Sequence, residues 1–537
     1  MRQHSTRPPT RTAPRAVTLG TGVALLAALL PVSGAQAAGR SCPDRDNDTY
    51  EELLDCVTLK GVRAHQLDLQ EIAEDSTDPD YPGSRAAGTD GYADSVDHVA
   101  ELLEEAGYDV TLDPIEFDFM FPAVLRQVAP AESDLETGAF TGSEPGELTG
   151  QVVPVDVNLT GDRASTSGCE AEDFTGLDLG GSSDIALVQR GTCTFGLKVQ
   201  NAQTAGAEAV IVFNQGNTPD REGVVVGDVS FLDLEQTIPF DAAIPVVGAS
   251  FADGVALAAP GSTAFLRVLP TERRTDHNVL AELPGENADN VVMAGAHLDS
   301  VPDGPGINDD GSGVAALLET ALMMARSEPQ NTVRFAFWAV EEKGLLGSAD
   351  YVGGLSEADL DRIALYLNFD MVGSPNHVSM VYDADESTFP SADTGVTIPP
   401  GSTAIEDLFE SWYTLIGEPY DDSAFTGRSD YQAFIDRGIP SGGVFTGAEV
   451  VKTDAQVAIW GGTAGEQFDP CYHLACDTAE NVNEDALERN SDLIAFAVLT
   501  YAFSTESVNG VAGTAVPGPA VELPAPEGPR GTFRTAG

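Results

Sequence analysis

Basic residues are scarce in this chain, and lysine is the scarcest of them. The 537 residues include 27 lysines and arginines against 85 aspartates and glutamates, which gives a formal net charge of −58 at pH 7. The lysines are Lys60, Lys198, Lys343 and Lys452. A surface this negative repels phosphate groups, which argues against nucleic acid and anionic membranes as partners. Adaptation to concentrated salt and ordinary secreted acidity both fit the composition, and the carboxylates are also able to bind calcium.

The chain also lacks an apolar run long enough to span a membrane. Its longest run extends from about Val17 to Leu30, shorter than the roughly 20 residues that a span requires. Arginines precede this run, and the small-residue sequence Ala35-Gln36-Ala37 follows it. This order is typical of a secretory signal peptide. We therefore predict that residues 1–37 are a signal peptide and that the mature protein is extracellular.

Cysteine is limited to six residues, a number that suggests three disulfides in an exported protein. Local spacing offers the pairs Cys42–Cys56, Cys169–Cys193 and Cys471–Cys476, although six cysteines allow fifteen connectivities. Cys471 and Cys476 flank His473, so a zinc-thiolate role is the alternative for this pair.

The texture of the sequence changes several times along the chain. Residues 50–107 have helical periodicity, and residues 109–119 alternate like a strand. Short β-rich pieces with many glycines continue to about residue 268, and strands alternate with helices from residue 278 onward. We expect strands over 290–294, 332–340 and 363–369 and a helix over 314–326 that Ser312 caps. From about residue 508 the chain is rich in Pro, Gly and Ala, and we predict a disordered tail.

The potential metal ligands lie in five distinctive phrases. In chain order these are Ala-His-Leu-Asp-Ser, Gly-Ile-Asn-Asp-Asp-Gly-Ser-Gly, Ala-Val-Glu-Glu-Lys-Gly, Asn-Phe-Asp-Met-Val-Gly and Cys-Tyr-His. They supply His297, Asp309, Glu342, Asp370 and His473, with Glu341 directly before Glu342. Imidazole nitrogen and carboxylate oxygen are zinc ligands, and one carboxylate is able to bridge two ions about 3.5–4 Å apart. The set therefore predicts a hydrolytic centre with two Zn²⁺ per chain.

These phrases, from about Asp276 to Ala502, resemble the M28 family of di-zinc exopeptidases, most closely its secreted bacterial leucine-preferring aminopeptidases. The resemblance implies that His297 and Asp370 bind one zinc, that Glu342 and His473 bind the other, and that Asp309 bridges them. It also implies that Glu341 is the general base and that Cys471 and Cys476 form a disulfide.

Four further residues are candidates around this centre. Asp299 lies two positions after His297, and a metal-bound imidazole usually donates its other N–H to a carboxylate or carbonyl, so we expect Asp299 to orient the ring. The family resemblance implies that the Tyr472 hydroxyl stabilises the tetrahedral intermediate, that Phe445 forms a wall of the side-chain pocket, and that Arg428 lies in the loop that meets the substrate's amino end. The alternatives are a surface acid for Asp299, core roles for Tyr472 and Phe445, and a surface salt bridge for Arg428. We interpret His65, His98, His277 and His377 as structural or exposed.

A second resemblance covers the β-rich stretch. The segment from Asp184 to Phe195, with Lys198, Asn201 and the strand that follows, is similar to a protease-associated domain. Such inserts act as lids or substrate guides, and a purely structural role is the alternative. The predicted fold is therefore an α/β zinc-exopeptidase (phosphorylase/hydrolase-like) mixed sheet flanked by helices, with a β-rich protease-associated domain inserted. The predicted boundaries are 1–37 signal peptide, 38–129 first part of the peptidase domain, 130–265 insert, 266–507 peptidase domain and 508–537 tail.

The sequence favours a secreted, monomeric di-zinc aminopeptidase that removes large apolar residues from peptides with a free N-terminus. One alternative is a di-zinc carboxypeptidase of the same superfamily. A carboxypeptidase needs basic residues for the terminal carboxylate, and the second half of the chain offers few besides Arg428 and Arg437. The other alternative is a non-catalytic zinc-binding module, which the presence of Glu341 and all five ligands disfavours.

Overall fold

The computed structural model describes residues 41–533 apart from 182, 219, 220 and 235. The predicted signal peptide lies outside the described residues. Within the described part, no helix combines the length and apolar character needed to cross a bilayer. The structure contains the disulfides Cys42–Cys56, Cys169–Cys193 and Cys471–Cys476, which are the pairs that local spacing offered.

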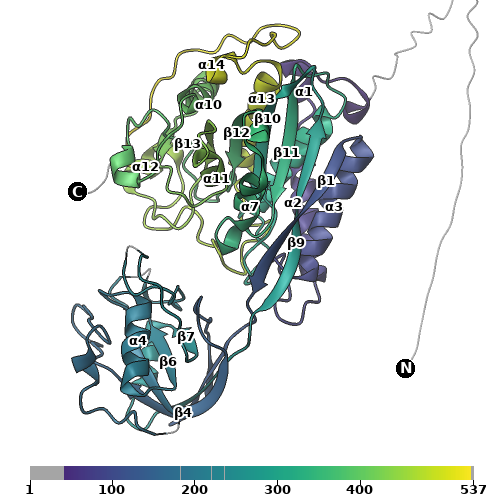
Figure 1. Ribbon diagram of the computed structural model, residues 1–537. Helices are drawn as coiled ribbons and strands as arrows, with labels where there is room; N and C mark the ends of the chain where they lie inside the picture. The colour runs from purple at the N-terminus through teal and green to yellow at the C-terminus, as the bar shows by residue number, and fades with distance from the viewer. Residues whose placement is uncertain (1–40, 182, 219–220, 235, 534–537) are drawn as a thin grey trace, which may run out of the picture. The chain divides into compact units, whose positions relative to one another are not determined.

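The larger sheet has eight strands in the order β1-β9-β11-β10-β12-β15-β13-β14 (Figure 1). Its central strands β11, β10, β12 and β15 run parallel. Strand β9 pairs antiparallel with β1 and β11, and β13 pairs antiparallel with β15 but parallel with β14. The mixed α/β architecture predicted from the sequence is therefore confirmed. The strands are β1 (Asp109–Phe119), β9 (Glu272–Leu283), β10 (Asn287–His297), β11 (Asn331–Trp338), β12 (Ile363–Phe369), β13 (Met380–Tyr382), β14 (Asp421–Ser423) and β15 (Ser441–Phe445).

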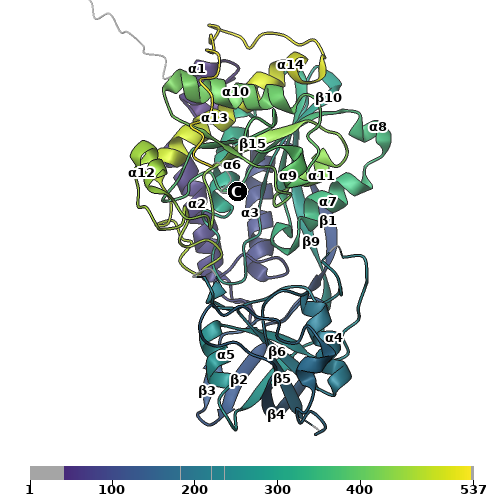
Figure 2. The same ribbon diagram turned by 90° about the vertical axis from the view of Figure 1, so that its left-hand side faces the viewer.

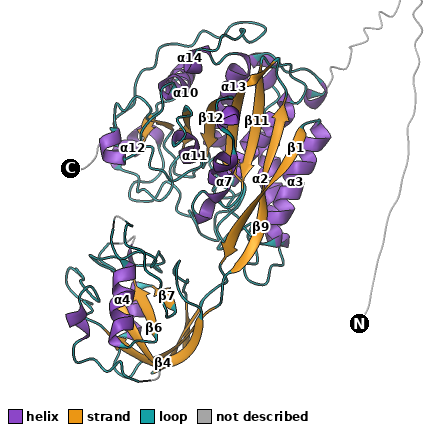
Figure 3. Ribbon diagram, viewed as in Figure 1, coloured by secondary structure: helices purple, strands orange, loops and turns teal. Residues whose placement is uncertain are grey.

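Helices cover both faces of this sheet (Figure 3). Val292, Ala294 and Ala296 of β10 face one core with α1, α2, α3, α6, α10 and α13, whereas Val291 and Met293 face a second core with α7, α8 and α11. Successive strand residues point to opposite faces, so a continuous apolar strand supplies both cores. The helices are α1 (Tyr50–Leu54), α2 (Leu59–Asp75), α3 (Asp90–Ala106), α6 (Gly311–Met324), α7 (Leu346–Gly354), α8 (Glu357–Leu360), α9 (Ser391–Thr394), α10 (Ser402–Ile416), α11 (Tyr431–Ile435), α12 (Asp454–Trp460), α13 (Glu484–Phe503) and α14 (Glu506–Asn509).

The second sheet has seven strands in the order β3-β2-β8-β4-β5-β6-β7 (Figure 2). It has two apolar clusters of its own, one on each face. Its elements are β2 (Val124–Ala129), β3 (Ser133–Leu135), β4 (Gly146–Pro154), β5 (Asp184–Gln189), α4 (Phe195–Ala205), β6 (Ala209–Phe213), β7 (Val246–Ala249), α5 (Phe251–Leu257) and β8 (Thr263–Val268). Phe119 of β1 pairs with Glu272 of β9, so the chain leaves the larger sheet and returns to it at adjacent positions.

The helix after the second ligand phrase begins earlier than the sequence suggested. It spans Gly311–Met324, and its N-cap is Asp310, whose carboxylate accepts a hydrogen bond from Gly313 N at 3.0 Å. Ser312 does not cap the helix, because its hydroxyl donates to Asn308 O at 2.7 Å. Aspartate is as good an N-cap as serine, so the two residues could not be told apart by type alone.

The C-terminal segment differs from the predicted disordered tail. The short helix α14 is followed by an irregular stretch in which Val516 and Leu523 pack against the core. Near its end, Arg530 N donates to Tyr420 O at 3.0 Å, and Gly531 N donates to Asp421 Oδ1 at 2.9 Å. A few apolar anchors and these backbone hydrogen bonds hold a segment whose average composition predicts disorder.

Candidate metal centre

The predicted ligands gather at one edge of the larger sheet. His297 is the last residue of β10, Asp370 directly follows β12, and Glu341 comes three residues after the end of β11. These strands run parallel, so their carboxyl ends meet at the same edge, where sites in open α/β sheets gather. Asp309 precedes α6, and the disulfide Cys471–Cys476 closes a short loop around His473.

The Asp309 carboxylate lies between the two imidazoles. Its Oδ1 is 3.1 Å from His297 Nε2, and its Oδ2 is 3.2 Å from His473 Nε2. Asp309 is 5 % exposed, so both oxygens are committed to these contacts rather than to solvent. One oxygen toward each imidazole is the arrangement that a bridging carboxylate requires.

Each imidazole has one further carboxylate near it, Asp370 beside His297 and Glu342 beside His473. Asp370 Oδ1 is 3.8 Å from His297 Nε2, and Glu342 Oε2 is 3.1 Å from His473 Nε2. Glu342 Oε1 is buried without a hydrogen-bond partner among the described residues. An unpaired buried carboxylate oxygen is costly unless a cation accompanies it, so this donor set fits metal ions.

Glu341 faces the same pocket but makes no ion pair with either imidazole among the described side chains. It is 8 % exposed and lines a cavity of about 500 Å³ together with His297, Asp309 and Asp370. Val340, directly before it, has a left-handed φ of 58°, a strained conformation for a β-branched residue. The turn at this residue lets Glu341 and Glu342 leave the backbone in different directions.

Asp299 is buried beside the potential metal ligands, and both its backbone carbonyl and its carboxylate make contacts there. Its backbone carbonyl lies 3.0 Å from His297 Nδ1, and its carboxylate Oδ1 lies 3.7 Å from the same nitrogen. The carboxylate also accepts hydrogen bonds from the backbone N–H groups of Glu341 at 3.0 Å and Glu342 at 3.3 Å. A single buried residue therefore contacts both the His297 ring and the turn that carries the two glutamates.

Tyr472, Arg428 and Phe445 line the same pocket. Arg428 Nη2 donates to the Tyr472 hydroxyl at 3.2 Å, and Arg428 Nη1 donates to Glu449 Oε1 at 2.6 Å. The Tyr472 hydroxyl oxygen thus accepts from Arg428, which leaves the phenolic proton available to another acceptor. Phe445 adjoins an apolar wall that Met380 and Phe468 extend.

The electrostatics of the pocket favour cations. Burial raises the pKa of Glu341 well above its usual value and that of Glu342 to about 7. Burial also raises the pKa of Asp370. Although burial opposes it, the hydrogen bonds with Asp309 and Glu342 raise the pKa of His473 to about 10. Closely spaced carboxylates that share little solvent draw positive charge, whether as protons or as metal ions.

Sequence reasoning missed three residues that hold the ligands. Asp310 is fully buried, and its carboxylate accepts from His297 N and Met371 N, both at 3.0 Å. Asp477 accepts from Asp309 N at 3.0 Å, and Ser429 donates to Asp370 Oδ2 at 2.6 Å. The doubled aspartate of the second phrase was a usable signal for Asp310. The other two contacts join distant segments, and no local pattern marks them. Phe533, from the segment predicted to be disordered, also lines the pocket.

Comparison with known proteins gives two family matches. Peptidase family M28 matches residues 278–498, and the PA domain matches residues 148–257. An aminopeptidase of Pseudomonas aeruginosa is 45 % identical over 80 % of this chain and 78 % of its own length. Leucine aminopeptidase 2 of Arthroderma otae is 38 % identical over 90 % of this chain and 92 % of its own length. Among solved structures, a zinc aminopeptidase from Bacillus subtilis is similar with a TM-score of 0.61 and 26 % identity, over 82 % of this chain and 94 % of that chain.

Proposed function

We propose that this chain, which belongs to peptidase family M28 and is an aminopeptidase, is secreted, holds two zinc ions and removes large apolar residues from the N-termini of peptides. The observation that carries the proposal is the Asp309 carboxylate, with one oxygen 3.1 Å from His297 and the other 3.2 Å from His473. His297 and Asp370 would hold one ion and Glu342 and His473 the other, with Asp309 shared. Bound zinc supplies Lewis-acid chemistry that polarises the peptide carbonyl and makes water more acidic. A calcium ion stays a prediction from composition.

Glu341 is the proposed general base and then the general acid. Its Oε atoms take a proton from water and later deliver it to the leaving amine. Burial raises its pKa, which suits a carboxylate that must carry a proton between the two steps. The Asp299 carboxylate fixes the turn that presents Glu341, through the hydrogen bond from Glu341 N.

Tyr472 is proposed to stabilise the negative charge that develops on the substrate's carbonyl oxygen. Its hydroxyl oxygen accepts from Arg428, so its proton is free to donate toward the pocket. Burial raises the pKa of Tyr472, which keeps the phenol protonated as a donor. Donors that strengthen as charge develops account for much of the rate acceleration in acyl transfer.

The apolar wall supports a preference for large apolar side chains. Phe445, Phe468 and Met380 line the pocket beside the metal ligands, with Phe389 and Phe533 nearby. Leucine aminopeptidase 2 of Arthroderma otae carries leucine in its name, and the same preference is proposed here. The secretory location is supported by three disulfides, which persist in oxidising compartments.

A free α-amino group should be required, because the pocket carries several carboxylates and little positive charge. Of the described residues that line it, Arg428 is the only lysine or arginine, and it is paired with Glu449. Acetylating the N-terminus of a leucyl peptide should lower kcat/KM by about 100-fold, the equivalent of losing one buried charge pair. The measurement compares Leu-peptide and acetyl-Leu-peptide hydrolysis by product analysis. Release of C-terminal residues from the acetylated peptide would contradict this prediction and support the carboxypeptidase alternative.

The inserted sheet is proposed to guide access to the pocket without supplying catalytic groups. All residues that line the cavity lie between His297 and Phe533, and the insert has its own apolar clusters. Because Phe119 and Glu272 are strand partners, a short turn is able to replace residues 120–271. Such a variant should keep leucine anilide hydrolysis and change its rates on long peptides. Loss of anilide turnover in a folded, zinc-loaded deletion variant would show that the insert completes the site.

A further inference from the structure

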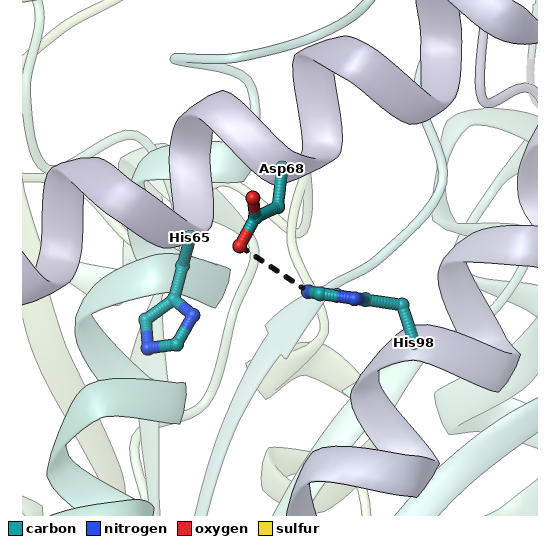
Figure 4. A group of neighbouring side chains, drawn as sticks. All are labelled: His65, Asp68 and His98. Atoms are coloured by element: carbon teal, nitrogen blue, oxygen red, sulfur yellow. Dashed lines mark ion pairs between the residues drawn. The ribbon is translucent and has the colours of Figure 1, made fainter.

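Two histidines and one aspartate, residue types that are able to bind metal ions, lie close together between helices α2 and α3. His65 and Asp68 lie three positions apart on one face of α2, and His98 projects from α3 toward them (Figure 4). One potential ligand atom from each of the three lies within 4.8 Å of the others. None of these residues belongs to the set His297, Asp309, Glu342, Asp370 and His473.

Both imidazoles present an unused nitrogen. His65 Nδ1 and His98 Nε2 are shielded from solvent and have no hydrogen-bond partner within the described part of the chain. A buried ring nitrogen without a hydrogen-bond partner destabilises the fold unless a ligand satisfies it. Burial lowers the pKa of His98, which keeps its ring neutral and its lone pair available.

The second nitrogen of His65 is held by a carboxylate. His65 Nε2 lies 3.3 Å from Glu319 Oε2 on α6, and both side chains are buried. A proton on Nε2, donated to Glu319, leaves the lone pair on Nδ1. Carboxylate–histidine pairs of this kind orient metal-bound imidazoles and raise their basicity.

The distance between His98 and Asp68 also suits a metal ion. His98 Nε2 is 3.9 Å from Asp68 Oδ2, which is too long for a hydrogen bond. Two ligands of a tetrahedral zinc ion, each about 2.0–2.1 Å from the metal, lie about 3.3 Å apart. The Asp68 and His98 side chains are partly exposed, so a small change in their side-chain torsions is able to shorten the 3.9 Å distance to that value.

We propose that His65, Asp68 and His98 form a further binding site for a zinc-class divalent ion, separate from the centre that contains Asp309. Two imidazoles and one carboxylate are a zinc ligand set, and a fourth position is left for water. The ion would join α2 to α3 and, through Glu319, both helices to α6. Its role is to stabilise this helical layer rather than to act on substrate.

The test compares zinc binding by the wild-type protein, His98→Ala and Asp68→Asn, with His277→Ala as the matched control. At a fixed free Zn²⁺ concentration, elemental analysis should find one zinc fewer per chain in His98→Ala than in the wild-type protein. Asp68→Asn should weaken binding of that zinc by at least about tenfold. Adding Zn²⁺ should raise the Tm of the wild-type protein and His277→Ala more than that of His98→Ala, and leucine anilide turnover should be the same in all four.

Equal zinc content and equal Tm responses in the wild-type protein and His98→Ala would overturn the proposal. Should His98→Ala fold poorly, Asp68→Asn, a change at a half-exposed side chain, decides it by the same two measurements. The outcome is independent of the proposed catalytic centre. Failure of the two-zinc proposal lowers the total count in every variant, whereas failure of this proposal removes only the difference of one zinc between the wild-type protein and His98→Ala.

Discussion

Glu341→Gln should lower kcat on leucine anilides by about 10²–10⁴-fold, the usual contribution of a general base, without loss of bound zinc. The reason is its position, because Glu341 lines the pocket and makes no ion pair with His297 or His473 in the described part of the structure. The amide has the size of the acid but cannot take a proton. Steady-state kinetics and elemental analysis on the same preparation measure both effects.

The neighbouring residue supplies the contrast for this experiment. Glu342→Gln should lose zinc, because Glu342 Oε2 contacts His473 and Oε1 lacks any other partner among the described residues. Glu357→Gln, at an exposed position, is the inert control. Near-normal turnover in Glu341→Gln would mean that another group accepts the proton, and the general-base assignment would have to be withdrawn.

Many of the strands, and the position of the metal ligands at their ends, could be predicted because short stretches of sequence determine them. The strands over residues 109–119 and 363–369 were predicted with their observed bounds, since alternation and continuous apolar runs are strong local signals. His297 and Asp370 were expected at the same sheet edge, because each lies at the carboxyl end of a predicted strand. The helix cap was predicted wrongly, because Ser312 was expected to cap the helix and the structure has Asp310 there.

The residues that hold the ligands could not be predicted, because their contacts cross long stretches of chain. Asp477 reaches the backbone of Asp309, and Ser429 reaches Asp370, across separations that no periodicity reveals. The C-terminal segment was predicted to be less ordered than it is in the structure. Its composition predicts disorder, but two backbone hydrogen bonds to Asp421 and packing by Val516 and Leu523 order it. Composition measures the average residue, whereas a few well-placed anchors decide the result.

Asp309→Ala should remove most of both zinc ions and lower activity by more than about 10⁴-fold, because this single carboxylate contacts both imidazoles. Chelation of the wild-type protein should have the same effect, and added Zn²⁺ should restore activity to the wild-type protein but not to the variant. By comparison, His473→Ala should remove chiefly the ion that it shares with Glu342, since Asp370 contacts His297 instead. Elemental analysis before and after zinc restoration distinguishes the two patterns.

The matched control is Asp303→Asn, which lies in the same loop between β10 and α6 but is exposed and outside the pocket. It should keep both zinc ions and normal turnover, so any loss in Asp309→Ala cannot be ascribed to general disturbance of the loop. If Asp309→Ala lost one zinc and kept the other tightly bound, the two ions would not share this carboxylate. The bridging assignment would then be wrong, and Asp310, whose oxygens now accept from His297 N and Met371 N, would have to be considered as a ligand.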